Sequence, residues 1–423
     1  MAISCAKKTD ESGYIGPSEI QITDGVMTPE TLLAFGRLSD PQLSPDGSRI
    51  LYGVSYTDIA QNRSCRNLFL CNPDGSDKVQ LTRYAKSVSG ARWANDGQSI
   101  YFIQGGQLWK APLKGNQLGK REQLSDFPNG VSEFKLSPDQ QQVILVSTIK
   151  NKALEQPADA YEDLDKAQAY ATEDLMYRHW DHWVEDISHT FIAPLANGMI
   201  TEGLDILGGP DVKFQLPNGP YGGIENLCWS PDGRYIAYSC KKKAGKEYAF
   251  STDTEIYIYC ILTGETTVIP MAGGYDTVPV WSPDGSKIAW LSMARDGYEA
   301  DKVRLMLADV VYAPEGEGQT ANPTIENIVD LTAGFDYNAD GPVWAADGKS
   351  LYFNSLVEGL QGIFNVIPGP EPSFIRLTAP SLWFDFGTPF AVLQDGTLLT
   401  TYCSMDFPTE LVAVNDNSIH QLT

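Results

Sequence analysis

The sequence predicts an all-β protein, a seven-bladed β-propeller of four-stranded antiparallel blades. Three observations predict it: a Ser-Pro-Asp-Gly turn recurs along the chain, apolar residues stand at fixed distances on both sides of each turn, and the composition favours short strands. The 423 residues include 38 Gly and 26 Pro, and 11% are aromatic. Repeats of about 40 to 60 residues with four short strands each are typical of propeller blades.

The repeated turn explains its own residue types. Ser opens a type I turn, Pro presets φ at the next position, and Gly closes it. The full tetrapeptide stands at 44–47, 230–233 and 282–285. Degenerate copies stand at 94–97, 137–140, 345–348 and 393–396, so the sequence contains seven units.

The residues that flank the turns show that the repeat is structural. The residue before each turn is large and apolar in all seven units: Leu43, Trp93, Leu136, Trp229, Trp281, Trp344 and Val392. The third residue after each turn is aliphatic in all seven: Ile50, Ile100, Val143, Ile236, Ile288, Leu351 and Leu399. These two fixed apolar positions predict that the first strand of each blade ends at the turn and that the second strand begins just after it.

The repeat also predicts the domain organisation. Residues 1–25 are expected to be a tail or tether, and residues 26–423 the propeller. The blades are expected near 41–82, 89–125, 131–209, 224–272, 278–333, 340–378 and 386–423. The long third unit requires an insertion, 150–187, and apolar spacing from Tyr161 to Trp183 predicts that it is helical. Eight blades are the alternative, if residues 14–40 contribute more than a lead-in strand.

The charge excludes several classes of partner. The 31 basic and 54 acidic residues give a net charge of −23. Such a surface repels phosphate backbones and anionic lipid, so nucleic acid is not expected as a partner. No apolar run is long enough for a transmembrane segment.

The N-terminus has two interpretations. Ala2-Ile3-Ser4-Cys5, followed by polar residues, is similar to the end of a bacterial lipoprotein signal. Cys5 would then carry lipid, and the protein would be periplasmic or anchored to the cell envelope, although no complete signal sequence is present. The alternative is an ordinary disordered terminus. The six other cysteines match no metal or redox spacing and are expected to be small buried apolar residues.

Several segments resemble a known family. The turn resembles the TolB-type propeller repeat, and residues 27–40 and 176–183 resemble the propeller of prolyl oligopeptidase family serine peptidases. Residues 251–257 and 293–302 resemble the dipeptidyl peptidase/acylaminoacyl peptidase branch in particular. The resemblance runs from about residue 27 to the end of the sequence.

The resemblance implies a function for which this chain is incomplete. In the family, the propeller is followed by an α/β-hydrolase domain with the catalytic Ser, Asp and His. No G-x-S-x-G nucleophile elbow occurs in these 423 residues. We therefore expect a non-catalytic propeller that gates the active site of a serine exopeptidase, has short peptides and a C-terminal hydrolase domain as partners, and is inactive alone. The alternative is a stand-alone TolB-like propeller that scaffolds envelope proteins.

Substrate recognition is expected from the insertion. In the relatives, a propeller segment projects acidic residues that hold the free N-terminus of the substrate. A carboxylate about 4 Å from an ammonium gains roughly 4 kcal/mol at an effective dielectric of 20. The candidates that the resemblance implies are Glu173, Asp174, Arg178, Trp180, Asp181, Glu185 and Asp186, with Glu299 and Asp301 next. The alternative is a plain amphipathic helix, in which an Asp174–Arg178 pair contributes only about 0.3–0.5 kcal/mol.

No catalytic residue, cofactor or metal site is expected in this chain. His179 and His182 can share a helix face, but no further ligand set accompanies them, so a structural role is favoured. Lys241-Lys242-Lys243 is interpreted as a solvated loop tip.

Overall fold

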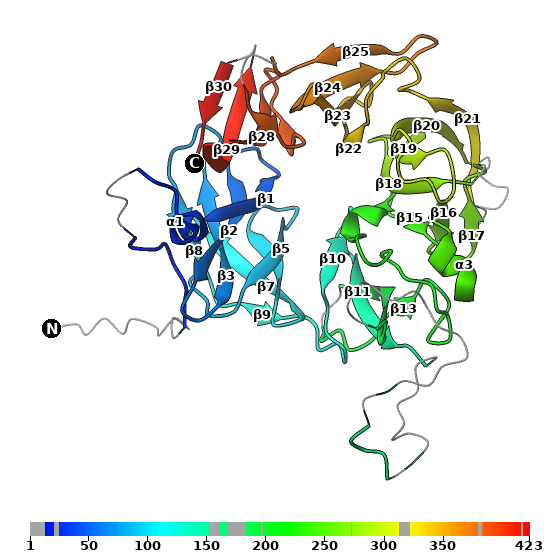
Figure 1. Cartoon of the computed structure of the whole chain (residues 1–423), viewed down its shortest axis with the longest axis horizontal. Coiled ribbons are helices and arrows are strands. Elements are labelled where there is room, and N and C mark those ends of the chain that lie inside the picture. Colours follow the sequence, from blue (N-terminus) through cyan, green and yellow to red (C-terminus); the bar gives the residue numbers. More distant parts are fainter. Residues whose placement is uncertain are drawn as a thin grey trace. The chain divides into compact units, whose positions relative to one another are not determined.

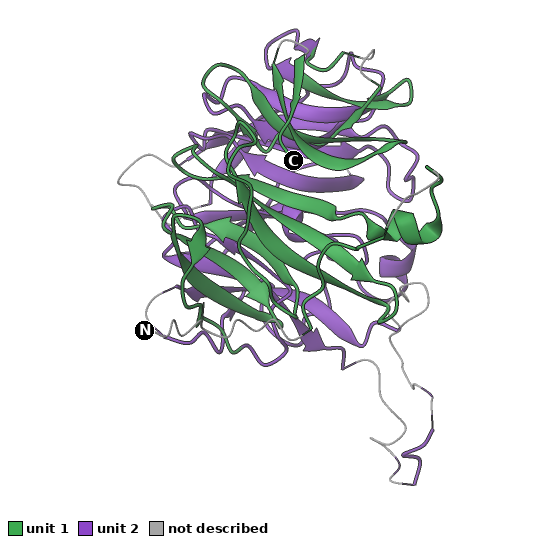
Figure 2. Cartoon of the chain, turned by 90° about the vertical axis from the view of Figure 1, so that its left-hand side faces the viewer, with its two compact units in different colours: residues 1–126, 356–364, 376–423 green, residues 127–355, 365–375 purple. Residues whose placement is uncertain are grey.

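The computed structural model describes residues 13–20, 25–152, 161, 163–167, 169, 183–195, 198–271, 273–312, 322–379, 383–415 and 418–423. The chain divides into two compact units, coloured separately in Figure 2. Unit 1 comprises residues 1–126, 356–364 and 376–423, and unit 2 comprises residues 127–355 and 365–375.

The described residues form seven antiparallel sheets, so the prediction of a seven-bladed propeller is confirmed (Figure 1). The first two sheets are β1 (Arg37–Leu43), β2 (Ile50–Asp58), β3 (Arg63–Cys71) and β4 (Val79–Gln80), then β5 (Val88–Trp93), β6 (Ser99–Gln104), β7 (Gln107–Lys114), β8 (Gln117–Leu118) and β9 (Glu122–Gln123). The last sheet is β26 (Asp385–Phe386), β27 (Ala391–Val392), β28 (Leu398–Ser404), β29 (Phe407–Asn415) and β30 (Ser418–Gln421).

Unit 2 contains three complete four-stranded sheets. They are β10 (Glu133–Leu136), β11 (Gln142–Lys150), β12 (Asp186–Pro194) and β13 (Leu204–Asp205); β14 (Leu227–Trp229), β15 (Tyr235–Cys240), β16 (Glu255–Cys260) and β17 (Thr266–Val268); and β18 (Tyr275–Trp281), β19 (Lys287–Met293), β20 (Arg304–Val311) and β21 (Thr324–Asp330). The sixth blade along the chain is β22 (Asp340–Trp344), β23 (Leu351–Val357), β24 (Leu360–Ile367) and β25 (Ser373–Arg376).

The described helices are short. They are α1 (Pro29–Ala34), α3 (Gly245–Phe250) and the 3₁₀ helix η1 (Ile224–Asn226). Residues 29–43 form α1 and the inner strand β1, so the described part of segment 14–40 supplies no eighth blade. Within the described residues, no helix has the length and apolar character needed to cross a bilayer.

The third blade carries the insertion that the long unit requires. β11 and β12 pair along their full length, from Gln142 opposite Pro194 to Lys150 opposite Asp186, so residues 151–185 are inserted between two neighbouring strands. Most of the helix expected there lies outside the described residues. Among its described residues, 161, 163–167 and 169, Leu164 N–H donates to Tyr161 O and Ala167 N–H donates to Leu164 O.

The turns that begin with Ser are closed by hydrogen bonds of that Ser and of the Asp two residues later. In the fourth blade, Ser230 Oγ donates to Asp232 Oδ1 at 2.6 Å and accepts from Tyr235 N–H at 2.9 Å, while Arg234 N–H donates to Asp232 Oδ1. Ser44 and Ser282 make the same bonds in their turns. In the first turn, hydrogen bonds from Ser44 and Ser48 lower the pKa of Asp46 to about 2.

Tryptophans placed before the turns link neighbouring blades. Trp93 Nε1 donates to Gln42 O, which lies on the inner strand of the preceding blade, at 3.3 Å. Two further tryptophans repeat this bond at 3.2 Å, from Trp229 to Lys135 O and from Trp344 to Val280 O. The tryptophan before the turn therefore fixes its own blade against the preceding one, in addition to burying apolar surface.

The antiparallel order gives every blade two distinct ends. The Ser-Pro-Asp-Gly turn and the connection from the third to the fourth strand lie at one end, which we call the turn end. The connection from the second to the third strand lies at the other, which we call the loop end. In unit 2, the loop ends carry the insertion 151–185, residues 241–254 with α3, and residues 294–303.

The six cysteines of the described residues are free thiols. Cys65, Cys71, Cys240 and Cys260 are buried, and Cys228 and Cys403 are half-buried. The prediction that most of them act as small buried apolar residues is confirmed.

The turn hydrogen bonds give a prediction for stability. Ser230→Ala removes a donor and a buried acceptor, so we expect it to lower the free energy of unfolding by about 1–2 kcal/mol. The sixth blade offers the reverse change, because Ala345 stands where Ser230 stands in the fourth. Ala345→Ser should therefore raise the free energy of unfolding, as measured by urea denaturation. Equal stability of all three proteins would contradict this role of the turn serine.

Candidate functional site

A pocket at the loop end of unit 2 is the strongest candidate site. Its volume is about 500 Å³. It is lined from four directions: by residues 218–222, which precede η1, by the β15–β16 connection, by Tyr275 at the start of β18, and by Met293 and Glu299 at and beyond the end of β19. Because these segments all emerge at the loop end, the pocket opens on the same side as the insertion of the third blade.

Asp296 joins the two loops that form most of the pocket. Its carboxylate accepts from Ser251 Oγ at 2.8 Å, from Thr252 N–H at 2.8 Å and from Asp253 N–H at 3.1 Å. Gly297 N–H returns a bond to Thr252 Oγ1 at 2.8 Å. Burial acts to raise the pKa of Asp296, but these hydrogen bonds outweigh it and hold the pKa below its ordinary value. The clamp therefore requires the ionised carboxylate.

Lys241 forms the cationic part of the lining. Its ammonium donates to Tyr248 O at 3.0 Å and Ser251 O at 3.1 Å, and it lies 4.0 Å from the centroid of the Tyr248 ring. Burial lowers the pKa of Lys241, while the negative charges of Asp296 and Glu299 act to raise it. Lys241 therefore binds two backbone carbonyls of the β15–β16 connection and so holds this connection against its own side chain.

The neighbouring lysines correct one expectation from the sequence. Lys243 pairs with Asp253 at 2.9 Å, and Lys242 lies 3.7 Å from the centroid of the Tyr257 ring. The interpretation of residues 241–243 as a solvated loop tip is wrong. The sequence hides these roles because the partners are backbone carbonyls and rings from other strands.

Tyr248 connects the pocket wall to the insertion. It is 2% exposed and packs in one buried cluster with Val184 and Ile187, against which Ile149 also packs. Val184 and Ile187 flank the point where the chain returns from the insertion into β12. The end of the insertion is therefore fixed directly against a residue that lines the pocket.

The structure describes only some of the site residues that were predicted from the sequence. Glu173, Asp174, Arg178, Trp180 and Asp181 lie outside the described residues, as does Cys5, so their roles stay predictions. Glu185 and Asp186 are exposed beside the Val184–Ile187 contact but do not line the pocket. Asp186 forms an exposed ion pair with Lys150 at 2.8 Å.

The two reserve candidates, Glu299 and Asp301, are separated clearly. Asp301 is paired with Arg295, whose Nε donates to both carboxylate oxygens at 2.9 and 3.0 Å, and only 10% of its side chain is exposed. Glu299 lines the pocket and is exposed, and it has no hydrogen bond or ion pair with any described residue. Glu299 is therefore the carboxylate that remains available to a ligand.

Aromatic residues that the sequence reasoning missed complete the lining. Tyr221 is exposed, and Tyr275 is half-buried, with its pKa raised by burial and by the charges of Glu299 and Glu225. Met293 lies next to them. A carboxylate among aromatic and thioether side chains suits a ligand that carries an ammonium beside an apolar group.

Asp276 lies directly behind the pocket. It is 3% exposed, its backbone carbonyl accepts from Thr254 Oγ1 at 2.7 Å, and its Oδ1 has no hydrogen-bond partner among the described residues. Burial raises the pKa of Asp276 to about 6, against the opposing effects of Ser292 and Arg304.

The comparisons agree with this architecture. No family model matches the chain. The chain is 41% identical over 358 residues to dipeptidyl-peptidase 5 of Porphyromonas gingivalis. The aligned residues cover 84% of this chain and 50% of that protein. The chain is 26% identical over 411 residues to dipeptidyl-peptidase 5 of Aspergillus fumigatus, covering 89% of this chain and 53% of that protein. The chain thus spans about half the length of the curated relatives it matches.

Solved structures show the same fold. The uncomplexed acylaminoacyl peptidase of Pyrococcus horikoshii matches 93% of this chain and 53% of its own, with a TM-score of 0.63 at 14% identity. The β-propeller domain of the Trilobed protease from Pyrococcus furiosus matches 92% of this chain and 98% of its own, with a TM-score of 0.56 at 13% identity. The fold shared with these structures is thus a β-propeller. Within that class, the chain is a homologue of the dipeptidyl-peptidase 5 proteins over their propeller portion.

The buried carboxyl group gives a prediction for pH dependence. The folded protein holds the Asp276 proton up to about pH 6, whereas the unfolded chain releases it near pH 4. The contribution of Asp276 to the free energy of unfolding therefore falls as the pH rises from about 4 to about 6, because ionisation of the buried carboxyl opposes folding. Since an amide cannot ionise, Asp276→Asn should be more stable than wild type at pH 8 by roughly 1–3 kcal/mol and should lose that advantage at pH 4.

Urea unfolding at pH 4, 6 and 8 measures the difference. Asp126→Asn is the control, because Asp126 is exposed and the change should have little effect at any of the three pH values. A stability difference between Asp276→Asn and wild type that stays constant with pH would show that Asp276 does not titrate in this range.

Proposed function

We propose that this chain is the propeller part of a dipeptidyl-peptidase-type serine peptidase and that the pocket at the loop end of unit 2 binds the free N-terminus of short peptides. The observation that carries the proposal is the unpaired carboxylate of Glu299 in an aromatic pocket of about 500 Å³. The homology to dipeptidyl-peptidase 5 supports peptides as the ligand.

The chemistry of the lining fits a peptide N-terminus. Glu299 would accept the ammonium, while Tyr221, Tyr275 and Met293 offer apolar area to the first side chain. An ammonium about 4 Å from a carboxylate gains about 1 kcal/mol in bulk water and about 4 kcal/mol at an effective dielectric of 20. Since Glu299 is exposed, the pair would become strong only when the ligand and a covering domain exclude water.

The distribution of exposed apolar residues supports a covering domain. Large exposed apolar side chains stand at the loop ends of several blades: Ile59, Leu356 and Met405 in unit 1, and Phe250 and Tyr298 in unit 2. The seven Ser-Pro-Asp-Gly-type turns, all of which are described, carry no such residue, but the turn end also has Met199 and Leu262, in connections from the third to the fourth strand, and Ile367, at the end of β24. Exposed apolar side chains at the loop end favour its burial by another body, which we propose is the catalytic domain.

The charge of Glu299 provides the test. In the full-length gene product, Glu299→Gln should lower kcat/KM at least tenfold on dipeptidyl substrates with a free N-terminus and leave N-acetylated substrates almost unchanged, because the amide keeps the shape but loses the attraction for the ammonium. Glu265→Gln is the matched control, since Glu265 is an exposed glutamate at the turn end of the fourth blade.

Three outcomes would count against the proposal. If Glu299→Gln keeps the preference for free N-termini, the anchor lies elsewhere. If Glu265→Gln loses as much activity as Glu299→Gln, the effect is a general one of charge. A reading frame that stops naturally after codon 423 would favour a scaffolding propeller instead.

A further inference from the structure

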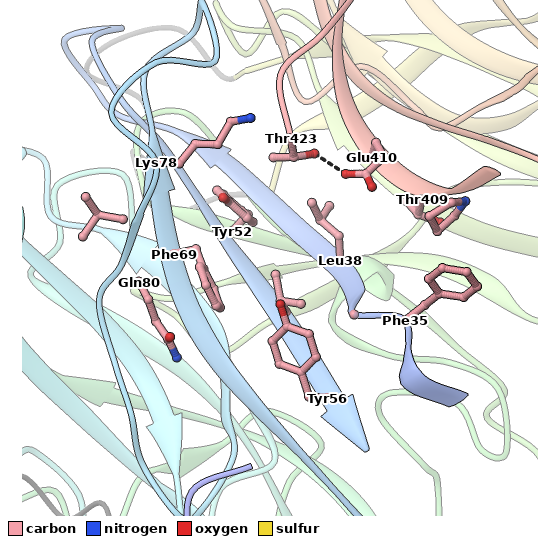
Figure 3. A pocket seen from close by; sticks show the side chains of 14 residues that line it. Phe35, Leu38, Tyr52, Tyr56, Phe69, Lys78, Gln80, Thr409, Glu410 and Thr423 are labelled. Carbon is pink, nitrogen blue, oxygen red and sulfur yellow. Dashed lines mark hydrogen bonds between the residues drawn. The ribbon is translucent and has the colours of Figure 1, made fainter. Parts of the chain in front are cut away.

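A second pocket, in unit 1, lies between the first and last blades along the chain (Figure 3). Its volume is about 390 Å³. The wall from the first blade consists of residues of β1 to β4 and of the segment before β1, and the opposite wall consists of Pro408, Thr409, Glu410 and Thr423. The pocket is separate from the peptide site proposed above, and this inference does not depend on that function.

The floor of the pocket is a stacked aromatic pair. Tyr52 in β2 pairs across the strands with Phe69 in β3, and their rings lie 5.7 Å apart with an interplanar angle of 24°. Tyr56 and Phe35 add aromatic area at one edge, as Figure 3 shows. The pair therefore presents the negative faces of π-systems to an open space.

Other blades place a cation over the ring that corresponds to Phe69. The corresponding third-strand aromatics are Trp109, Tyr257 and Phe364, each preceded by an aliphatic residue, as Phe69 is by Leu68. Arg121 lies 4.9 Å from the Trp109 ring centroid, Lys242 lies 3.7 Å from that of Tyr257, and Arg376 lies 5.5 Å from that of Phe364. Among the described residues, no lysine or arginine occupies this position over Phe69.

The fourth blade shows most directly what the first blade lacks. Tyr238 and Tyr257 form the same cross-strand stack as Tyr52 and Phe69, at 5.3 Å and 22°. Lys242 covers it, and its ammonium donates to Tyr238 Oη at 3.0 Å. Lys242 stands twelve residues after the turn residue Ser230, and the same offset from Ser44 leads to Tyr56.

The two other cation positions are also different in the first blade. Arg376 precedes Leu377-Thr378 as Gln80 precedes Leu81-Thr82, so a neutral amide stands where the sixth blade has its arginine. Lys78 corresponds to Arg121, but its side chain is exposed and points toward Thr423, at the edge of the pocket away from Tyr56 (Figure 3). The first blade thus keeps the aromatic platform without covering it.

Glu410 adds the complementary charge. It lies across the pocket from Tyr52 and accepts a hydrogen bond from Thr423 Oγ1 (Figure 3). Burial raises the pKa of Tyr52 and Tyr56, and the negative charge of Glu410 adds to both shifts. A carboxylate that acts on both phenols gives the aromatic end of the pocket a negative potential.

We propose that this pocket binds a small organic cation, a substituted ammonium or a guanidinium, which lies over Phe69 and Tyr52 and pairs with Glu410. The ligand takes the place that Lys242 occupies in the fourth blade. A volume of about 390 Å³ admits an alkylated ammonium or an arginine side chain. The source is either a free amine or a basic side chain of a peptide, and the two share this chemistry.

Isothermal titration calorimetry on the purified protein tests the proposal. The probes are choline and agmatine as free cations, and an N-acetylated, C-amidated tripeptide with central arginine as the peptide source. The same tripeptide with central norleucine is the uncharged control. We expect at least one cationic probe to bind and the norleucine peptide not to bind; agmatine or choline binding alone indicates a free amine, and peptide binding alone indicates a side chain.

Four variants locate the binding. Tyr56→Lys should abolish it, because it places a lysine at the position of Lys242 and so covers the stack from within. Phe69→Leu should weaken it about threefold to thirtyfold by removing a cation–π partner. Glu410→Gln should also weaken it, whereas Lys78→Gln should preserve or strengthen it. Thermal unfolding of each variant confirms that it is folded.

The proposal is overturned if none of the three cationic probes binds, or if the norleucine peptide binds as well as the arginine peptide. It is also overturned if binding persists unchanged in both Phe69→Leu and Glu410→Gln, which places the site elsewhere. Should Tyr56→Lys fail to fold, these two variants still decide the matter.

Discussion

The fixed register between each turn and the two strands that it joins is the constraint on which the rest of the structure depends. Ser and Asp side chains close the turn, and the bond from Tyr235 N–H to Ser230 Oγ sets where the second strand begins. From that point the strand alternation decides which residues face the neighbouring blade. In three blades the tryptophan before the turn then bonds to the preceding blade, as Trp229 does to Lys135 O.

Once the register is fixed, the loop ends are free to vary. The β15–β16 and β19–β20 connections depart from the blade pattern and are joined by Asp296, an ionised carboxylate that replaces the hydrogen bonds a sheet would supply. This arrangement places Glu299 in the pocket without pairing it. The pocket in unit 1 also arises at a position that varies between blades. Lys242 covers the aromatic stack of the fourth blade, whereas Tyr56 stands at the corresponding position of the first blade and leaves its stack uncovered.

The sequence predicts the blades well because their determinants are local. The turn tetrapeptide and the apolar residues at fixed offsets lie within about ten residues of each other, and all seven units were identified from them. The pocket of unit 2 was not predicted, since it depends on contacts between distant segments, such as Tyr248 with Val184 and Lys241 with backbone carbonyls. The family resemblance implied Glu299 and Asp301 together, and only the geometry separates the free carboxylate from the one that is paired with Arg295.

The central claim is that the loop end of unit 2 receives peptides through the pocket that contains Glu299. Hydrogen–deuterium exchange of the purified full-length gene product with and without a non-hydrolysable dipeptide analogue tests it most directly. The account predicts slower exchange at the amides of residues 218–222, 248–254 and 293–299, and no change at the turns 230–233 and 282–285. Protection confined to the turn end, or no protection in the three lining segments at saturating ligand, would contradict it.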